Sequence, residues 1–217
     1  MKNLQDTLSL VKERLLAIKR LKSLKARLAE IQKLKLAADS SVDLLLLYLT
    51  DDSSRDVRQQ ALEVLTERGG PLCRIAARAA LSDPWVLVRN TAAEALGEVG
   101  NKQDVPRLIL ALSDKDWIVC ASAASSLGSL GGSRARKALL DALERTSHPD
   151  IKRYVAVALA DLGDPSVIPN LTKILETETR KQVQSGLFYA LYLLVLQLDF
   201  KCLLWFRKVE RICPSCL

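Results

Sequence analysis

Few side chains in this sequence have the type and spacing that chemistry needs. His148 is the only histidine, and no Gly-x-Ser-x-Gly motif places a nucleophile near it, so we expect it in a surface loop. Cys213 and Cys216 form a Cys-x-x-Cys pair, which supplies two ligands where structural zinc needs four. The glycine-rich run 128–133 lacks the Gly-Lys-Ser/Thr of a phosphate-binding loop and is better explained as a turn between helices. We therefore predict no catalytic residue, no metal site and no cofactor, and we leave metal binding by the terminal cysteines open.

The elements that would position any site follow from an internal repeat. One pattern recurs at residues 57–69, 88–100, 119–131, 151–163 and 183–195, with starts that lie 31 or 32 residues apart. Its first position is Val or Ile and its ninth is Leu, a spacing that places both on one face of a helix. Four copies end in a glycine, where we expect a left-handed residue to terminate the helix: Gly69, Gly100, Gly131 and Gly163.

A second apolar segment precedes each copy of the pattern. It is clearest at residues 105–112 and 168–175, which share apolar-Pro-x-Leu-x-x-x-Leu. Proline is tolerated in the first turn of a helix, so each repeat reads as a pair of helices. Alanines in the second helix of each pair would let neighbouring repeats approach closely.

At this point the chain resembles the HEAT-repeat family, in particular its short variety found in bilin (phycobilisome) lyase subunits and many prokaryotic scaffolds. The resemblance covers residues 37–197. It is carried by Val57-Arg58 and Val88-Arg89, by two prolines, and by an Asp six residues before each Arg; the prolines and aspartates are Pro106, Pro169, Asp52 and Asp83. The fold class we predict is all-α, a right-handed α-solenoid of about five HEAT-like helix pairs with a long amphipathic helix at the N-terminus.

The positions of Arg58, Arg89 and Lys152 recur from repeat to repeat and could form a cationic stripe. The resemblance implies instead that the preceding aspartate pairs with the arginine between adjacent repeats, and we favour this structural role. Cys120 takes the place of the arginine in the third repeat, where we expect the ladder to be interrupted. Trp85 and Trp117 precede their helices by two or three residues; they could be stacking platforms, but we expect them to staple one repeat to the next.

The two ends of the chain differ from the repeats. Residues 1–36 hold ten Lys or Arg and three Asp or Glu, whereas residues 37–217 hold twenty-two of each, so the whole excess of +7 lies in the first segment. We predict that residues 1–36 form a basic amphipathic helix that caps the repeats or binds a partner. Residues 198–217 read as a truncated half-repeat and tail with an apolar edge: Leu203, Leu204, Trp205 and Phe206.

The number of cysteines and the composition of the N-terminus indicate the cellular compartment of the protein. Five cysteines, an odd number in a chain of 217 residues, favour a reducing environment over a disulfide framework. The N-terminus lacks the uninterrupted apolar core of a signal peptide. We therefore expect a cytoplasmic protein.

The function we predict is a non-enzymatic protein-protein interaction scaffold or adaptor whose partner is not specified by the sequence. Its docking face would be the concave surface of the inner helices, with Gln59, Glu63, Asn90, Glu94, Ser125, Arg153 and Tyr189. Self-association through the C-terminal edge would be a second contact. One alternative is a bilin lyase or isomerase subunit, which the resemblance alone implies. Another is binding of nucleic acid or an anionic membrane through the basic N-terminal helix; we do not expect nucleic acid, and a solvated helix face explains the lysines better than a membrane.

Overall fold

The computed structural model describes residues 2–39 and 41–197, and within them every regular element is a helix. The predicted C-terminal edge (Leu203, Leu204, Trp205 and Phe206) and the Cys-x-x-Cys pair lie outside the described residues. The helices are α1 (Lys2–Arg20), α2 (Leu24–Lys33), η1 (Leu34–Leu36), α3 (Ser41–Leu49), α4 (Arg55–Arg68), α5 (Pro71–Ala80), α6 (Val86–Val99), α7 (Val105–Ala111), α8 (Trp117–Leu130), α9 (Ser133–Arg145), α10 (Pro149–Asp161), η2 (Pro165–Val167), α11 (Ile168–Thr177) and α12 (Lys181–Gln197). No described helix combines the length and the apolar character that crossing a membrane requires.

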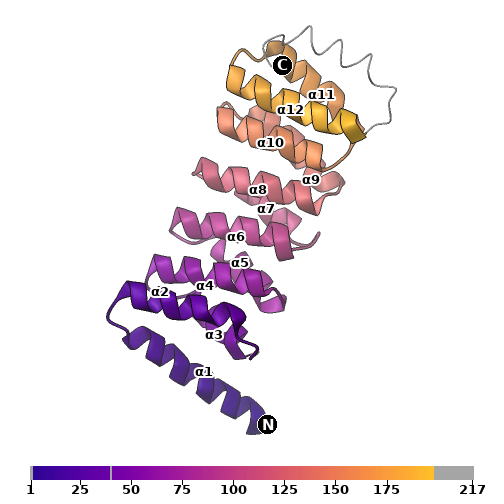
Figure 1. Ribbon diagram of the computed structural model, residues 1–217. Coiled ribbons are helices and arrows are strands. Elements are labelled where there is room, and N and C mark those ends of the chain that lie inside the picture. The colour runs from indigo at the N-terminus through magenta and orange to yellow at the C-terminus, as the bar shows by residue number, and fades with distance from the viewer. Residues whose placement is uncertain (1, 40, 198–217) are drawn as a thin grey trace. The chain divides into compact units, whose positions relative to one another are not determined.

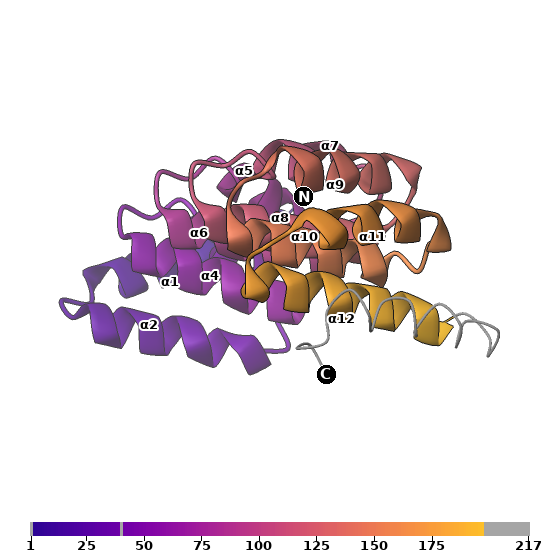
Figure 2. The same cartoon turned by 90° about the horizontal axis from the view of Figure 1, so that it is seen from above.

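The chain divides into two compact units, Met1–Gly100 (unit 1) and Asn101–Leu217 (unit 2). In unit 1 the even-numbered helices α2, α4 and α6 pack side by side in one layer, and α1, α3 and α5 form a second layer (Figure 1). In unit 2 the helices α8, α10 and α12 lie side by side, and α7, α9 and α11 lie along one side of that layer (Figure 2). Five helix pairs, α3–α4 to α11–α12, cover the repeats expected over residues 37–197, so the all-α fold of paired helices is confirmed.

The N-terminal segment differs from the single long helix expected for residues 1–36. It forms two helices, α1 and α2, separated by residues 21–23, and Ser23 takes an extended backbone (φ −95°, ψ 128°) at the start of α2. The break lets Val11 and Ile18 of α1 face α3 while Ile31 of α2 faces α4, which one straight helix could not do. The segment is therefore a pair of helices that packs on the first repeat, with α1 against α3 and α2 against α4.

Small residues bring the even-numbered helices of unit 2 into close contact. A Cβ atom added to Gly128 of α8 would lie 2.9 Å from the carbonyl oxygen of Ala158 in α10. One added to Gly186 of α12 would lie 2.5 Å from Cγ of Arg153 in α10. The seams between these helices are filled by the Val and Leu positions of the repeat, among them the fully buried Leu127, Leu159 and Leu191. Glycine and alanine therefore set the spacing, and the branched side chains fill the core.

A ladder of ion pairs joins adjacent repeats in unit 1. Arg58 donates from Nε and Nη2 to the two carboxylate oxygens of Asp83 at 2.7 and 2.8 Å, and Arg27 donates from Nη2 to both oxygens of Asp52 at 2.8 Å. Each aspartate lies 25 residues after its arginine, in the following repeat. The aspartate six residues before an arginine contributes its backbone carbonyl instead, as Asp52 does to Arg58 at 2.9 Å. Arg58 thus has the predicted structural role between adjacent repeats, but the expected carboxylate partner is wrong: Arg58 binds the following Asp83, and the carboxylate of the preceding Asp52 binds Arg27.

Each ladder carboxylate also orders its own loop. Asp52 accepts a hydrogen bond from the backbone N–H of Ser54, and Asp83 accepts one from the N–H of Trp85, at 2.9 and 2.8 Å. Burial alone would raise the pKa of Asp83, but the hydrogen bonds from Arg58 and from the Trp85 N–H hold it below its ordinary value. One side chain therefore starts a helix and fixes the register of the repeat before it.

The ladder in unit 2 keeps the geometry with different residues. Lys152 donates to Glu178 at 3.2 Å, and Gln184, at the arginine position of the last repeat, donates to the carbonyl oxygen of Glu178 at 2.7 Å. Cys120 replaces arginine, and its thiol donates to the carbonyl oxygen of Asp114, 3.2 Å away. Hydrogen bonds from Arg180, together with Lys152, lower the pKa of Glu178 from 4.5 to about 2, against the effect of its burial.

Three of the four predicted helix-ending glycines have the expected conformation. Gly69, Gly131 and Gly163 have φ values of 74°, 69° and 64°. Gly100 has φ −76° and ψ −179°, so its left-handed assignment is wrong. Its N–H still bonds to the carbonyl of Leu96, so the helix ends there without a left-handed residue.

We predict that Glu178→Gln reduces the acid dependence of stability. Because the folded-state pKa of Glu178 is depressed, its contribution is present above pH 4.5 and is lost as the pH falls from there toward 2. The variant should be less stable than the wild type at pH 7 by about 1–2 kcal/mol, and this difference should shrink toward zero below pH 3. Urea unfolding followed by circular dichroism at a series of pH values measures it. A stability difference that is the same at pH 7 and pH 3 would contradict the assignment.

We predict that Gly128→Ala destabilises the protein although alanine is the better helix former. Alanine in place of glycine in a helix interior normally adds about 0.5–1 kcal/mol, but here the new methyl group would meet the Ala158 backbone. We expect a net loss of about 1–2 kcal/mol in the free energy of unfolding. Ser125→Ala, at an exposed site of the same helix, is the control and should change stability by less than about 0.5 kcal/mol. A gain in stability for Gly128→Ala would show that α8 and α10 are not in tight contact.

Candidate functional site

The predicted docking residues of unit 1 pair with one another within their helices. Gln59 Nε2 donates to Glu63 at 2.8 Å in α4, and Asn90 Nδ2 donates to Glu94 at 3.0 Å in α6. Gln60 adds a second hydrogen bond to Glu63 at 3.2 Å. This face is therefore an amide and carboxylate surface whose groups are already hydrogen-bonded.

The predicted docking residues of unit 2 lie on three neighbouring helices: Ser125 on α8, Arg153 on α10 and Tyr189 on α12. Ser125 and Tyr189 are exposed, and Tyr189 presents 52% of its surface to solvent. Arg153 is half-buried, lies 3.6 Å from Asp150 and stacks over the ring of Tyr154, 4.7 Å from its centroid. The stem of Arg153 is held against the backbone of Gly186.

Two further tyrosines extend this face, and the sequence analysis did not select them. Tyr154 and Tyr192 expose 38% and 39% of their surfaces. We call Arg153, Tyr154, Tyr189 and Tyr192 the tyrosine surface. Tyr189 and Tyr192 are three residues apart, on one side of α12, and the signal that could have found Tyr154 is its place next to Arg153.

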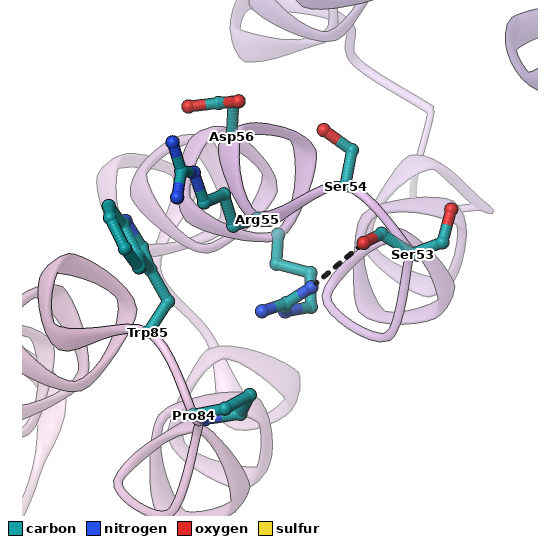
Figure 3. Close-up of a pocket in the computed structure, with 7 residues that line it drawn as sticks. Ser53, Ser54, Arg55, Asp56, Pro84 and Trp85 are labelled. Carbon is teal, nitrogen blue, oxygen red and sulfur yellow. Dashed lines mark hydrogen bonds between the residues drawn. The ribbon is translucent and has the colours of Figure 1, made fainter.

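A pocket of about 510 Å³ lies in unit 1 beside the loops that precede α4 and α6 (Figure 3). The guanidinium of Arg55 stacks on the ring of Trp85, with 3.7 Å between the guanidinium carbon and the ring centroid. Arg58 also lines the pocket, but its guanidinium is bound to Asp83. Arg55 makes no ion pair with any described residue. It was not selected from the sequence, where only Trp85 drew attention.

Unit 2 has a related stack at the same place in the repeat. Trp117 and His148 lie with ring centroids 5.6 Å apart and planes 16° from parallel. The two stacks use equivalent positions of the repeat. Arg55 and Trp117 lie two residues before the start of one copy of the pattern, and their partners Trp85 and His148 lie three residues before the start of the next copy. The expectation that the tryptophans staple adjacent repeats is confirmed. His148 lies in the loop before α10, as expected, but it is half-buried against Trp117, and its Nδ1 is buried without a hydrogen-bond partner.

The cations of the ladder do not form an open binding stripe. Arg58 and Lys152 are ion-paired, and Arg89 is 5% exposed and donates to the carbonyl oxygen of Asp83 at 2.9 Å. Over residues 2–39 and 41–197, no group of three or more His, Cys, Asp or Glu is placed to hold a metal ion. The exposed tyrosine surface and the Arg55–Trp85 pocket are two features that remain accessible after the helices have packed.

Comparison with known families agrees with this architecture. A family model of HEAT repeats matches residues 42–128 and 105–191. The chain belongs to the HEAT-repeat family. No curated protein sequence matches it.

Two solved structures are informative. A chain from the complex of CpcE and CpcF of phycocyanin lyase from Nostoc sp. PCC7120 is 28% identical, with a TM-score of 0.59 over 71% of this chain and 65% of that one. The protein thus matches just under two thirds of that chain's length. An engineered protein is 19% identical, with a TM-score of 0.52 over 85% of this chain and 96% of that one, and shares the fold.

We predict a measurable coupling between Arg55 and Trp85. A double-mutant cycle with Arg55→Ala, Trp85→Ala and the double variant should give an interaction free energy of about 0.5–1 kcal/mol, the size of a partly exposed cation–π contact. Chemical unfolding of the four proteins measures it. Arg74→Ala paired with Trp85→Ala serves as the control, and its effects should add. Additive effects for Arg55 and Trp85 as well would mean that the stack has no energetic role.

Proposed function

We propose that this HEAT-repeat protein is a non-enzymatic protein-interaction scaffold and that the tyrosine surface of unit 2 is its principal docking face. The observation that supports the proposal is the exposure of three tyrosines beside a fixed arginine on helices that are otherwise packed. Tyrosine and arginine are enriched at the centres of protein interfaces, because each offers a large rigid contact area together with hydrogen bonds. The helices beneath are held by close backbone contacts, so ordering this surface on binding costs little entropy.

The composition of the surface separates it from catalytic sites. Its ionisable neighbour is Asp150, which accepts a hydrogen bond from Gln182 at 2.7 Å and faces Arg153; Asp161 lies about two turns beyond Arg153 on α10. Burial raises the pKa of Asp161 above its ordinary value. No described nucleophile lies within hydrogen-bond reach of either carboxylate, so the arrangement offers recognition and not acid–base catalysis.

A second candidate function is that of a lyase subunit, and the 28% identity to a chain of the phycocyanin lyase complex favours it. That relative is part of a complex of two different proteins, so this function would require a second subunit and a tetrapyrrole. Mixing the purified protein with a free bilin and recording its absorption spectrum tests the first requirement. An unchanged spectrum, with and without a candidate second subunit, would count against this function.

We predict that Tyr154→Ser combined with Tyr189→Ser weakens partner binding at least tenfold, since loss of two interface tyrosines removes at least about 1.4 kcal/mol. Tyr48→Ser is the control, because Tyr48 is 50% exposed on α3, in the other layer and the other unit. Affinity capture with the full chain identifies proteins retained by the wild type and by Tyr48→Ser. Titration calorimetry then gives their dissociation constants for all three proteins. Partners that bind the double variant as tightly as the wild type would exclude this surface as the docking face.

A further inference from the structure

The first helix pair is open where the other five are closed. In each later repeat the two helices of a pair pack against each other, whereas α1 packs on α3, α2 packs on α4, and α1 and α2 touch little (Figure 1). The result is a cleft of about 410 Å³ within unit 1. We call it the N-terminal cleft; its lining residues are Arg14, Ala17, Ile18, Leu21, Glu30, Leu34, Ala37 and Leu45.

The walls of the N-terminal cleft are mainly apolar. Six of its eight lining residues are Ala, Leu or Ile, contributed by α1, by the break between α1 and α2, by the segment after α2 and by α3. Its volume falls within the range of pockets that accept several side-chain groups. More apolar surface stands beside it, since Leu16 and Leu24 are 43% and 40% exposed. A hydrophobic surface of this kind is suited to side chains inserted by a partner.

The surroundings of the cleft are strongly cationic. Residues 1–36 carry the entire net charge of +7, and the other 181 residues are neutral in sum. Several cations of this segment are compensated: Arg27 by Asp52, Lys33 by Glu30, and Lys35 by Glu67. Four lysines make no ion pair with any described residue, and all four are exposed: Lys12, Lys19, Lys22 and Lys25. A partner that covers the cleft gains from carrying negative charge.

The geometry favours a protein partner over a lipid surface. The apolar stripe that a membrane-binding helix would insert is already used in α1, because Val11 and Ile18 are 1% and 7% exposed against α3. Leu8, Leu10 and Leu16 of α1 remain 40–43% exposed, but the apolar residues of the cleft line a concavity, which receives side chains and does not insert into a bilayer. Phosphate contacts with nucleic acid would use the lysines but leave the apolar walls without a role.

We propose that the N-terminal cleft is a docking site for an acidic amphipathic helix of a partner protein, whose apolar side chains enter between α1 and α2 while its carboxylates face the unpaired lysines. Such a helix would take the place of the preceding repeat. The site lies in unit 1 and does not involve the tyrosine surface, so it extends the binding functions of the chain beyond the one proposed above.

The test uses the full chain and a designed peptide of about 18 residues, with leucine at every third or fourth position and glutamate at the others. A second peptide replaces each leucine with serine. Fluorescence anisotropy should give at least tenfold tighter binding of the leucine peptide, with an affinity that falls as salt is raised. Ala17→Glu, which places a carboxylate in the cleft at an exposed helix position, should weaken binding at least tenfold.

Gln5→Glu is the matched control, because it makes the same charge change on α1 outside the cleft and should alter the affinity less than twofold. Circular dichroism checks that both variants stay folded. Equal binding of the two peptides, or equal weakening by the two variants, would overturn the proposal by showing that net charge alone is sensed. The proposal would also be overturned if the protein bound phosphatidylserine vesicles or a DNA duplex, and if Ala17→Glu weakened that binding as strongly as it weakens binding of the peptide. The variant with both Tyr154→Ser and Tyr189→Ser should bind the leucine peptide as the wild type does, which keeps this result independent of the tyrosine surface.

Discussion

The rest of the structure depends on a carboxylate placed just before the second helix of most repeats, as Asp52 is before α4 and Asp83 before α6. In one repeat Asp83 receives the guanidinium of Arg58 from the repeat before, and it receives the N–H of Trp85 in its own loop. A single repeat cannot satisfy this group, because two of these three hydrogen bonds come from the neighbouring repeat. Removing one partner of such a buried pair leaves an uncompensated charge, which costs several kcal/mol. The ladder therefore makes correct stacking a condition for the stability of each loop.

Close approach of the even-numbered helices is the second constraint, and it explains where the polar side chains lie. Glycine and alanine occupy the positions at which α8, α10 and α12 touch, so larger side chains are confined to the seams or to the exposed face. Valine and leucine fill the seams. Tyrosines, glutamines and glutamates are left on the face that no other helix covers, where they are available for recognition.

These two constraints limit where function can lie. The cations that recur from repeat to repeat form the ion pairs of the ladder. The cationic stripe considered in the sequence is therefore not a free surface in the folded units. Binding capacity remains where the repeat is irregular: at the tyrosines of the last repeats in unit 2 and at the open first pair in unit 1. The one region of excess charge coincides with the one pair whose helices separate.

The sequence by itself determined the fold class, the five later helix pairs and most of their ends. Such features depend on local periodicity, as in the ninth-position leucines, and on local backbone preference, as at Gly69 and Gly131. It also indicated that arginine and aspartate join adjacent repeats. Only the tertiary structure decided that Asp83, and not Asp52, receives the Arg58 side chain, because that choice depends on how two repeats stack. The break in residues 1–36 has a partial local signal, because the spacing of the apolar residues shortens to three at Ile18, Leu21 and Leu24. That the chain breaks there, with α1 packed on α3 and α2 on α4, depends on the neighbouring helices and is decided only in the tertiary structure.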